Sequence, residues 1–153
     1  MPDLKLIALD AEDLAVISAN LQDAVMRVAD MAYLKREMRF AVITSRFDWV
    51  EAVKQGGAEP AYERRRAGLR FERVLDAKVQ GIDVAKTSGC LELLAIGFEP
   101  AGEPPEGHIT LHFAGGGAIK LHVECIEAEL KDLGETWRTR CKPEHAADDP
   151  SRT

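Results

Sequence analysis

The chain has few cysteines, few aromatic side chains and no long apolar segment. Its 153 residues include three cysteines, none of them in a Cys-x-x-Cys pair, and only 6% aromatic residues. Such cysteine pairs mark zinc knuckles and thioredoxin-type redox sites, so neither class of protein is predicted. No apolar run approaches the ~20 residues of a membrane span, and residues 1–5 lack the pattern of a signal peptide. We therefore expect a cytoplasmic protein with no membrane contact.

The composition is that of a water-soluble globular chain, with 46% hydrophobic and 30% charged residues. The length predicts one domain, because domains usually have about 100–200 residues. We place this domain at residues 1–138, and the polar segment 139–153 is expected to be a disordered tail. The formal charge of −6 argues against a general electrostatic affinity for nucleic acid.

Hydrophobic periodicity predicts a series of strands after one N-terminal helix. The helix is expected at residues 11–21, because Asp10 is a suitable N-cap and Leu14, Ile17 and Leu21 share one helical face. Alternation or continuous apolar runs predict strands at residues 4–9, 25–34, 39–49, 68–80 and 91–98, with an irregularity near 73–74. Residues 50–61 and 100–107 are expected to be loops.

The clearest pattern lies in the last third of the chain. Two alternating segments, 108–113 and 119–125, are joined by three glycines, which predicts a β-hairpin. After it, the spacing of Ile126, Leu130, Leu133 and Trp137 predicts a C-terminal helix that ends near residue 134.

These elements predict an α+β fold. We expect an antiparallel, strongly bent sheet or partial barrel of about six to seven strands, with one N-terminal and one C-terminal helix packed on it. This element order resembles the pleckstrin-homology-like fold, which implies the same shape for this chain.

Basic residues are concentrated in the middle of the sequence. Residues 35–78 contain 11 Lys and Arg against 7 Asp and Glu, a local charge of +4, whereas the remaining residues sum to −10. If the long strand begins near Tyr62, the expected pairing gathers Arg46, Arg64, Arg66 and Arg70 on one polar face beside Asp48, near Trp49. Guanidinium groups bind carboxylate and phosphate oxygens well, so this face is the candidate site for an anionic ligand or an acidic partner. The alternative is that these charges neutralise one another on a solvated face.

Histidines form a second candidate cluster, on the polar face of the predicted hairpin. His108 and His112 are about 13 Å apart on a strand that rises ~3.3 Å per residue, so they cannot share one metal ion. A three-residue loop would place His108 opposite His122, and a five-residue loop would place His108 opposite Glu124. Either register gives at most two ligands from the hairpin, so no metal is predicted.

No catalytic motif appears elsewhere. The glycine segment 114–118 lacks the Gly-Lys-Ser/Thr ending of a phosphate-binding loop. Cys90 is the cysteine to test for reactivity, but no cationic group precedes or follows it closely. No cofactor is predicted. An enzyme or metal-binding protein that uses His108, His122, Glu124 or Cys90 is the alternative to a binding function.

Several segments resemble an uncharacterised family, largely alphaproteobacterial, that is known only as a domain of unknown function, number 2948 in that series. The similarity is carried by residues 4–14, 46–49, 64–71 and, most specifically, 113–128, where a glycine hairpin leads into Val-Glu-Cys-Ile-Glu-Ala. The resemblance implies a small cytoplasmic bacterial protein and transfers no activity, cofactor or catalytic residue.

The sequence therefore predicts a small non-catalytic binding or interaction module. Its expected surface is the arginine-rich face, and its expected partner is an anionic ligand or an acidic protein, with nucleic acid disfavoured. An accessory subunit of a larger complex is the other open interpretation, and the sequence does not indicate an oligomeric state.

Overall fold

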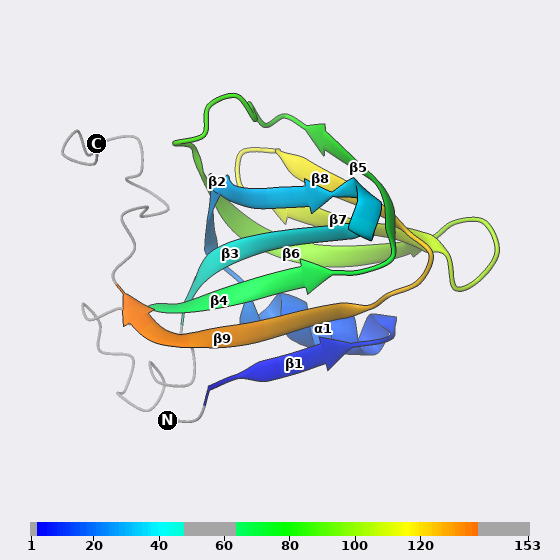
Figure 1. Cartoon of the computed structure of the whole chain (residues 1–153), viewed down its shortest axis with the longest axis horizontal. Coiled ribbons are helices and arrows are strands. Elements are labelled where there is room, and N and C mark those ends of the chain that lie inside the picture. The colour runs from blue at the N-terminus through cyan, green and yellow to red at the C-terminus, as the bar shows by residue number, and fades with distance from the viewer. Residues whose placement is uncertain (1–2, 48–63, 138–153) are drawn as a thin grey trace.

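The computed structural model describes residues 3–47 and 64–137, which form nine strands and one α-helix (Figure 1). The helix α1 spans Ala11–Asn20, and a short 3-10 helix, η1, spans Lys35–Glu37. The strands are β1 (Lys5–Ala8), β2 (Val25–Leu34), β3 (Arg39–Phe47), β4 (Arg64–Phe71), β5 (Val74–Gln80), β6 (Cys90–Pro100), β7 (Gly107–Phe113), β8 (Ala118–Val123) and β9 (Ala128–Trp137).

All nine strands belong to one antiparallel sheet in the order β1-β9-β4-β3-β2-β6-β7-β8-β5. Only Glu72 and Arg73 separate β4 from β5, although β4 is third in the sheet and β5 is last. The sheet therefore curls until β5 returns towards β3, where the amide of Val74 donates to the carbonyl of Met38 at 2.9 Å. Figure 1 shows β6, β7 and β8 behind β2 and β3.

The inner face of the curled sheet encloses one hydrophobic core, and α1 packs against β1 and β6 beside it. Asp10 caps the helix by accepting a hydrogen bond from the amide of Asp13 at 2.7 Å. Leu14 and Ile17 are buried on the inner helical face. The hydroxyl of Ser18 accepts from the amide of Ile96 at 2.9 Å, which fixes the helix to β6.

The expected pleckstrin-homology-like α+β fold with a terminal helix is wrong. The segment predicted as a C-terminal helix is the strand β9, which lies between β1 and β4 in the sheet. Its inward side chains are Ala128, Leu130 and Asp132, an alternation with period two, while Leu133 is 39% exposed on the other face. A carboxylate at a core position conceals this alternation, and the remaining apolar residues of the segment have a helical spacing.

The expected long strand at residues 68–80 is also wrong. This error accounts for part of the difference between the six to seven strands expected and the nine strands observed. It is divided into β4 and β5, which lie at separate places in the sheet. The break is at Arg73, whose φ of +62° is a left-handed conformation that a regular strand cannot contain. The irregularity predicted near residues 73–74 is therefore a complete change of direction.

The hairpin of β7 and β8 is confirmed, as are the strands β1, β2, β3 and β6 and the helix α1. The loop that joins β7 to β8 has three residues, 114–116, in which Gly115 and Gly116 adopt φ values of +89° and +95°. This loop length places His108 directly opposite His122.

No helix in the described ranges is long and apolar enough to cross a membrane. The predicted tail 139–153, the loop 50–61 and residues Asp48, Trp49 and Tyr62 lie outside the described residues.

Candidate functional site

The predicted arginine site is divided between the two faces of the sheet. Residues directly opposite each other in an antiparallel pair share a face. Arg46 lies opposite Arg65, whereas Arg64 lies opposite Phe47, so Arg46 and Arg64 are on opposite faces. The expected common face is therefore wrong for Arg46. Both faces of β3 carry apolar residues, and the face that contains Arg46 is the one that packs into the core.

Arg46 forms a buried ion pair with Asp132 of β9. The two side chains are 8% and 1% exposed, and Nε and Nη2 of Arg46 donate to the two carboxylate oxygens at 2.8 Å each. The amide of Leu4 donates to the same carboxylate at 2.9 Å. Burial alone would raise the pKa of Asp132, but these hydrogen bonds and the charges of Arg46 and Arg65 hold it below its ordinary value. Arg46 thus links β3, β9 and the start of β1, and its role is structural.

Arg64 and Arg66 lie on the outer face, away from the core. Nη1 of Arg64 donates to the carbonyl oxygens of Asp23 at 3.0 Å and Ser45 at 3.3 Å, and its guanidinium lies 5.8 Å from the centre of the Phe47 ring. Arg66 lies opposite Ser45 and is half-buried. The side chain of Arg64 is thus tied to neighbouring groups.

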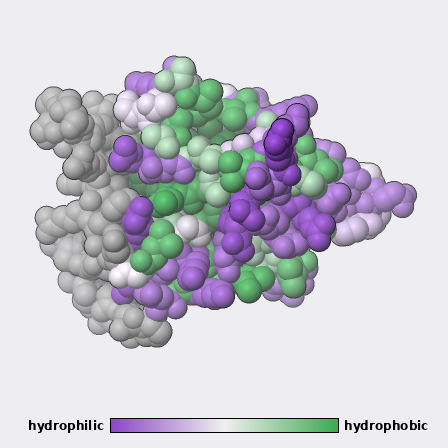
Figure 2. All heavy atoms as spheres, in the orientation of Figure 1, coloured by the Kyte–Doolittle hydropathy of each residue, from purple (hydrophilic) through white to green (hydrophobic). Residues whose placement is uncertain are grey.

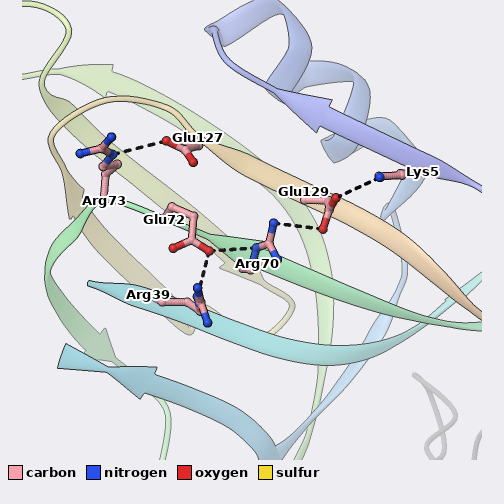
Figure 3. Close-up of polar contacts among 7 residues, drawn as sticks. All are labelled: Lys5, Arg39, Arg70, Glu72, Arg73, Glu127 and Glu129. Atoms are coloured by element: carbon pink, nitrogen blue, oxygen red, sulfur yellow. Dashed lines mark hydrogen bonds and ion pairs between the residues drawn. The ribbon is translucent and has the colours of Figure 1, made fainter. Parts of the chain in front are cut away.

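Arg70 belongs to a chain of ion pairs that crosses four strands (Figure 3). Its Nε is 2.9 Å and its Nη2 is 3.1 Å from the carboxylates of Glu72 and Glu129, respectively. Glu72 also accepts from Nε of Arg39 at 2.8 Å, and Glu129 lies 3.8 Å from Nζ of Lys5. Positive and negative groups therefore alternate from β3 to β1, with each carboxylate between two cations.

These residues are part of a larger surface that we name the basic outer face. Lys5 lies opposite Lys131, and Lys131 lies opposite Gly68, so the outward positions of β1, β9 and β4 are continuous with those of β3. Among the described side chains of these strands, with Glu72 after β4, the outward cations are Lys5, Arg39, Arg64, Arg66, Arg70 and Lys131, and the outward carboxylates are Glu72 and Glu129. Six positive and two negative charges give this face +4, on a chain of −6.

Exposed apolar side chains accompany the cations. Ile7 is 56% exposed and lies opposite Glu129, and Leu133 is two residues beyond Lys131 on the same face. Leu34, opposite Arg39, is exposed as well. Figure 2 shows polar and apolar residues interspersed over this side of the molecule. Sequence reasoning missed Lys5 and Lys131, because their grouping depends on β9 being a strand. It missed Arg39 because that residue alternates with the face of β3 that was expected to carry the polar side chains.

The histidine cluster is partly confirmed in its geometry. The rings of His108 and His122 are 5.0 Å apart, and Nε2 of His122 lies 2.6 Å from a carboxylate oxygen of Glu106. Glu124 does not join them; it lies 3.8 Å from Arg73. Within the part of the chain that the structure describes, no group of three or more His, Cys, Asp or Glu residues could hold a metal ion.

The two cysteines of the described chain differ in state. Cys90, at the start of β6, is disulfide-bonded, whereas Cys125 is a free and half-buried thiol. A sulfur atom in a disulfide is not a nucleophilic thiolate, so Cys90 cannot serve the enzymatic alternative in this state.

The comparisons with known proteins give a family and no activity. The sequence profile of a family described as "Protein of unknown function (DUF2948)" matches residues 4–145. No curated protein and no solved structure matches the chain.

Proposed function

We propose that this chain, which belongs to the DUF2948 family of proteins of unknown function, is a binding module that docks on an acidic protein surface through its basic outer face. The observation that carries the proposal is the separation of charge. The described side chains on one face of four neighbouring strands, with Glu72, sum to +4, while the whole chain has −6. A field of one sign over one face steers a partner of opposite charge and favours one docking orientation.

The spread of the cations favours a protein surface over a small anion. Neighbouring strands are about 4.8 Å apart, so positions on β1 and β3 are separated by roughly 14 Å. A phosphate-sized ligand could not contact both ends of that span. Arg70 already directs Nε and Nη2 to Glu72 and Glu129 and so is not arranged as a clamp for one small ligand.

The apolar residues of the face support the same partner. Ile7, Leu34 and Leu133 are all more than a third exposed beside the cations. Protein interfaces combine a partly apolar centre with arginine and a polar rim. Arg46 has no part in this proposal because it is buried with Asp132. The alphaproteobacterial origin and the cytoplasmic location expected from the sequence belong to the proposal.

A matched pair of charge reversals tests the proposal. Lys5 and Lys131 are directly opposite each other on the basic outer face, and Lys78 and Lys120 are directly opposite each other on β5 and β8. The variants Lys5→Glu/Lys131→Glu and Lys78→Glu/Lys120→Glu therefore change the net charge equally at two places in one sheet. The probe is fluorescent poly-L-glutamate, titrated with the full chain and followed by anisotropy.

We expect the first variant to lose at least tenfold in affinity and the second to stay within twofold of the parent. Affinity should also fall as salt is added, because exposed charges are screened within about 8 Å at physiological ionic strength. Equal losses in the two variants, or no loss in the first, would contradict the proposal. If inorganic pyrophosphate binds the same face more tightly than poly-L-glutamate, the partner class is wrong.

A further inference from the structure

The strand β5 forms one border of the sheet, and its outer edge is open. It pairs with β8, and in the described part of the chain no backbone hydrogen bond joins residues 75–80 to any other strand. Val74, the first residue of β5, donates its amide to the carbonyl of Met38. Figure 1 shows β5 at the border of the sheet beside β8. An open edge presents N–H and C=O groups to which a further strand can add.

The features that usually protect an edge strand are weak in β5. Natural edge strands are often very short, contain proline or are twisted away by a bulge. β5 has seven residues without proline or glycine, and its one irregularity with β8 lies at its start, between Val74 and Asp76. The strand at the opposite border, β1, has four residues. Leu75 and Val79 of β5 are more than a third exposed, so the open edge is also partly apolar.

Two charges of opposite sign lie in the regular part of β5. Asp76 and Lys78 are exposed and lie opposite His122 and Lys120, so they share the outward face of the sheet. Neither Asp76 nor Lys78 forms an ion pair with another described residue. Lys78 instead lies directly opposite a second lysine, which is an unfavourable pair in a sheet. A carboxylate on the other side of Lys78 would offset this repulsion.

We propose that β5 pairs with β5 of a second copy of this chain, in antiparallel orientation about a two-fold axis at Ala77. Ala77 is the central residue of the strand. In this register Asp76 lies opposite Lys78 of the second copy, and Lys78 lies opposite Asp76 of that copy, so the two-fold axis produces two ion pairs. Leu75 and Val79 lie opposite each other in the same way. The strand is therefore complementary to itself in both charge and apolar residues.

Neighbouring registers match less well. An axis at Asp76 would place two carboxylates directly opposite each other, and an axis at Lys78 would do the same with two ammonium groups; both arrangements are destabilising. A register that pairs Ala77 with Lys78 would set inward positions of one copy against outward positions of the other. The sequence of β5 therefore specifies one register with itself, which favours a second copy over an unrelated strand as its partner.

Exchanging the two charges tests this pairing. Sedimentation velocity of the full chain over the micromolar range should show a weak, concentration-dependent dimer, because a single pair of strands buries little surface. Asp76→Lys and Lys78→Asp each turn both ion pairs into like-charge contacts and should weaken dimerisation at least tenfold. An equimolar mixture of these two variants restores opposite charges across the axis, as does the double variant Asp76→Lys/Lys78→Asp. Both should dimerise within threefold of the parent.

Glu12→Lys is the matched control for Asp76→Lys. It makes the same change of charge at an exposed position on α1, which packs against β1 and β6, and it should leave the dimer unchanged. Because Asp76 and Lys78 are exposed, their substitution leaves the core unchanged, and circular dichroism checks this. A parent that stays monomeric, single variants that dimerise like the parent, or a mixture of the two that stays monomeric would each overturn the proposal.

The dimer and the proposed function can fail separately. The basic outer face lies on β1, β9, β4 and β3, at the other end of the sheet order, so each copy keeps a complete face. Sedimentation tests the dimer, and the anisotropy of poly-L-glutamate tests the face. The variant Lys78→Glu/Lys120→Glu should be monomeric, because it places a carboxylate opposite Asp76 of the second copy, and it should still bind poly-L-glutamate within twofold of the parent.

Discussion

Arg46 and Asp132 join the centre of the chain to its last strand through two parallel hydrogen bonds of 2.8 Å inside the core. Asp132 in turn accepts from the amide of Leu4 and donates its own amide to the carbonyl of Leu4, each at 2.9 Å. Three segments that are distant in sequence therefore meet at one carboxylate. This pair withdraws one arginine from the predicted binding site and explains why β9 contains an aspartate among its inward residues.

Breaking this pair from one side should destabilise the protein severely. Arg46→Leu leaves a buried carboxylate without its cation, and Asp132→Leu leaves a buried guanidinium, so each should lower the free energy of unfolding by about 3–5 kcal/mol. The double variant removes both charges and should recover most of that loss. Urea denaturation of the three variants measures these values. Single variants within about 1 kcal/mol of the parent would show that the pair is not the link described here.

The same pair predicts a pH dependence of stability. Because the pKa of Asp132 is lowered in the folded state, its contribution is fully present above the ordinary value for aspartate of ~3.9. It is lost as the pH falls below that value, through the pKa of the folded state. The parent should therefore lose stability more steeply below pH 4 than Asp132→Asn does. Parallel unfolding curves of the two proteins between pH 5 and pH 2.5 would contradict this prediction.

The parts of the fold that the sequence predicts are those whose pattern is local. The hairpin of β7 and β8 alternates on both sides of its glycines, and α1 has both a cap and an apolar face, so neither requires knowledge of distant residues. β9 could not be recognised, because Asp132 is a core residue only through its pairing with Arg46. A buried polar residue that depends on a distant partner breaks the period on which sequence reading depends.

The candidate site shows the same difference between positions set by local pattern and positions set by distant partners. Alternation along β4 correctly groups Arg64, Arg66 and Arg70, because side-chain direction within one strand is a local property. Which face of β3 is buried is decided by the whole sheet, so the sequence pattern alone places Arg46 on the wrong side. The position of Lys131 cannot be predicted from a local pattern, because Lys131 joins this face only when β9 pairs with β4.

Gly107 is predicted to tolerate no side chain. A Cβ at this position would lie 2.4 Å from the ring of Phe98 and 2.6 Å from the carbonyl oxygen of Glu99, and the backbone oxygen cannot move without breaking the pairing of β6 and β7. Gly107→Ala should therefore cost about 1–3 kcal/mol, as overpacking does. Gly97→Ala in β6 is the control, because a Cβ there meets nothing within 4 Å. Thermal denaturation that ranks Gly97→Ala below Gly107→Ala would refute the prediction.

Glu72 is predicted to stabilise the sheet and to weaken binding at the basic outer face. Its carboxylate holds the Nε atoms of Arg39 and Arg70 at 2.8 and 2.9 Å. Glu72→Gln removes a negative charge from between them, so the protein should lose about 0.5–2 kcal/mol, from two partly exposed ion pairs, and less in high salt. The same change raises the charge of the face from +4 to +5, so affinity for poly-L-glutamate should increase although stability decreases.

Glu103→Gln provides the control for Glu72→Gln, because it gives the same net charge from an exposed position in the loop 101–106. If binding depends on the local charge of the face, only Glu72→Gln should raise the affinity, by two- to fivefold at low salt, since a local field decays within a Debye length of about 10 Å at 0.1 M ionic strength. Anisotropy titrations and urea denaturation on the same samples separate the two effects. Equal gains in the two variants would assign the interaction to net charge and remove the basic outer face as its location.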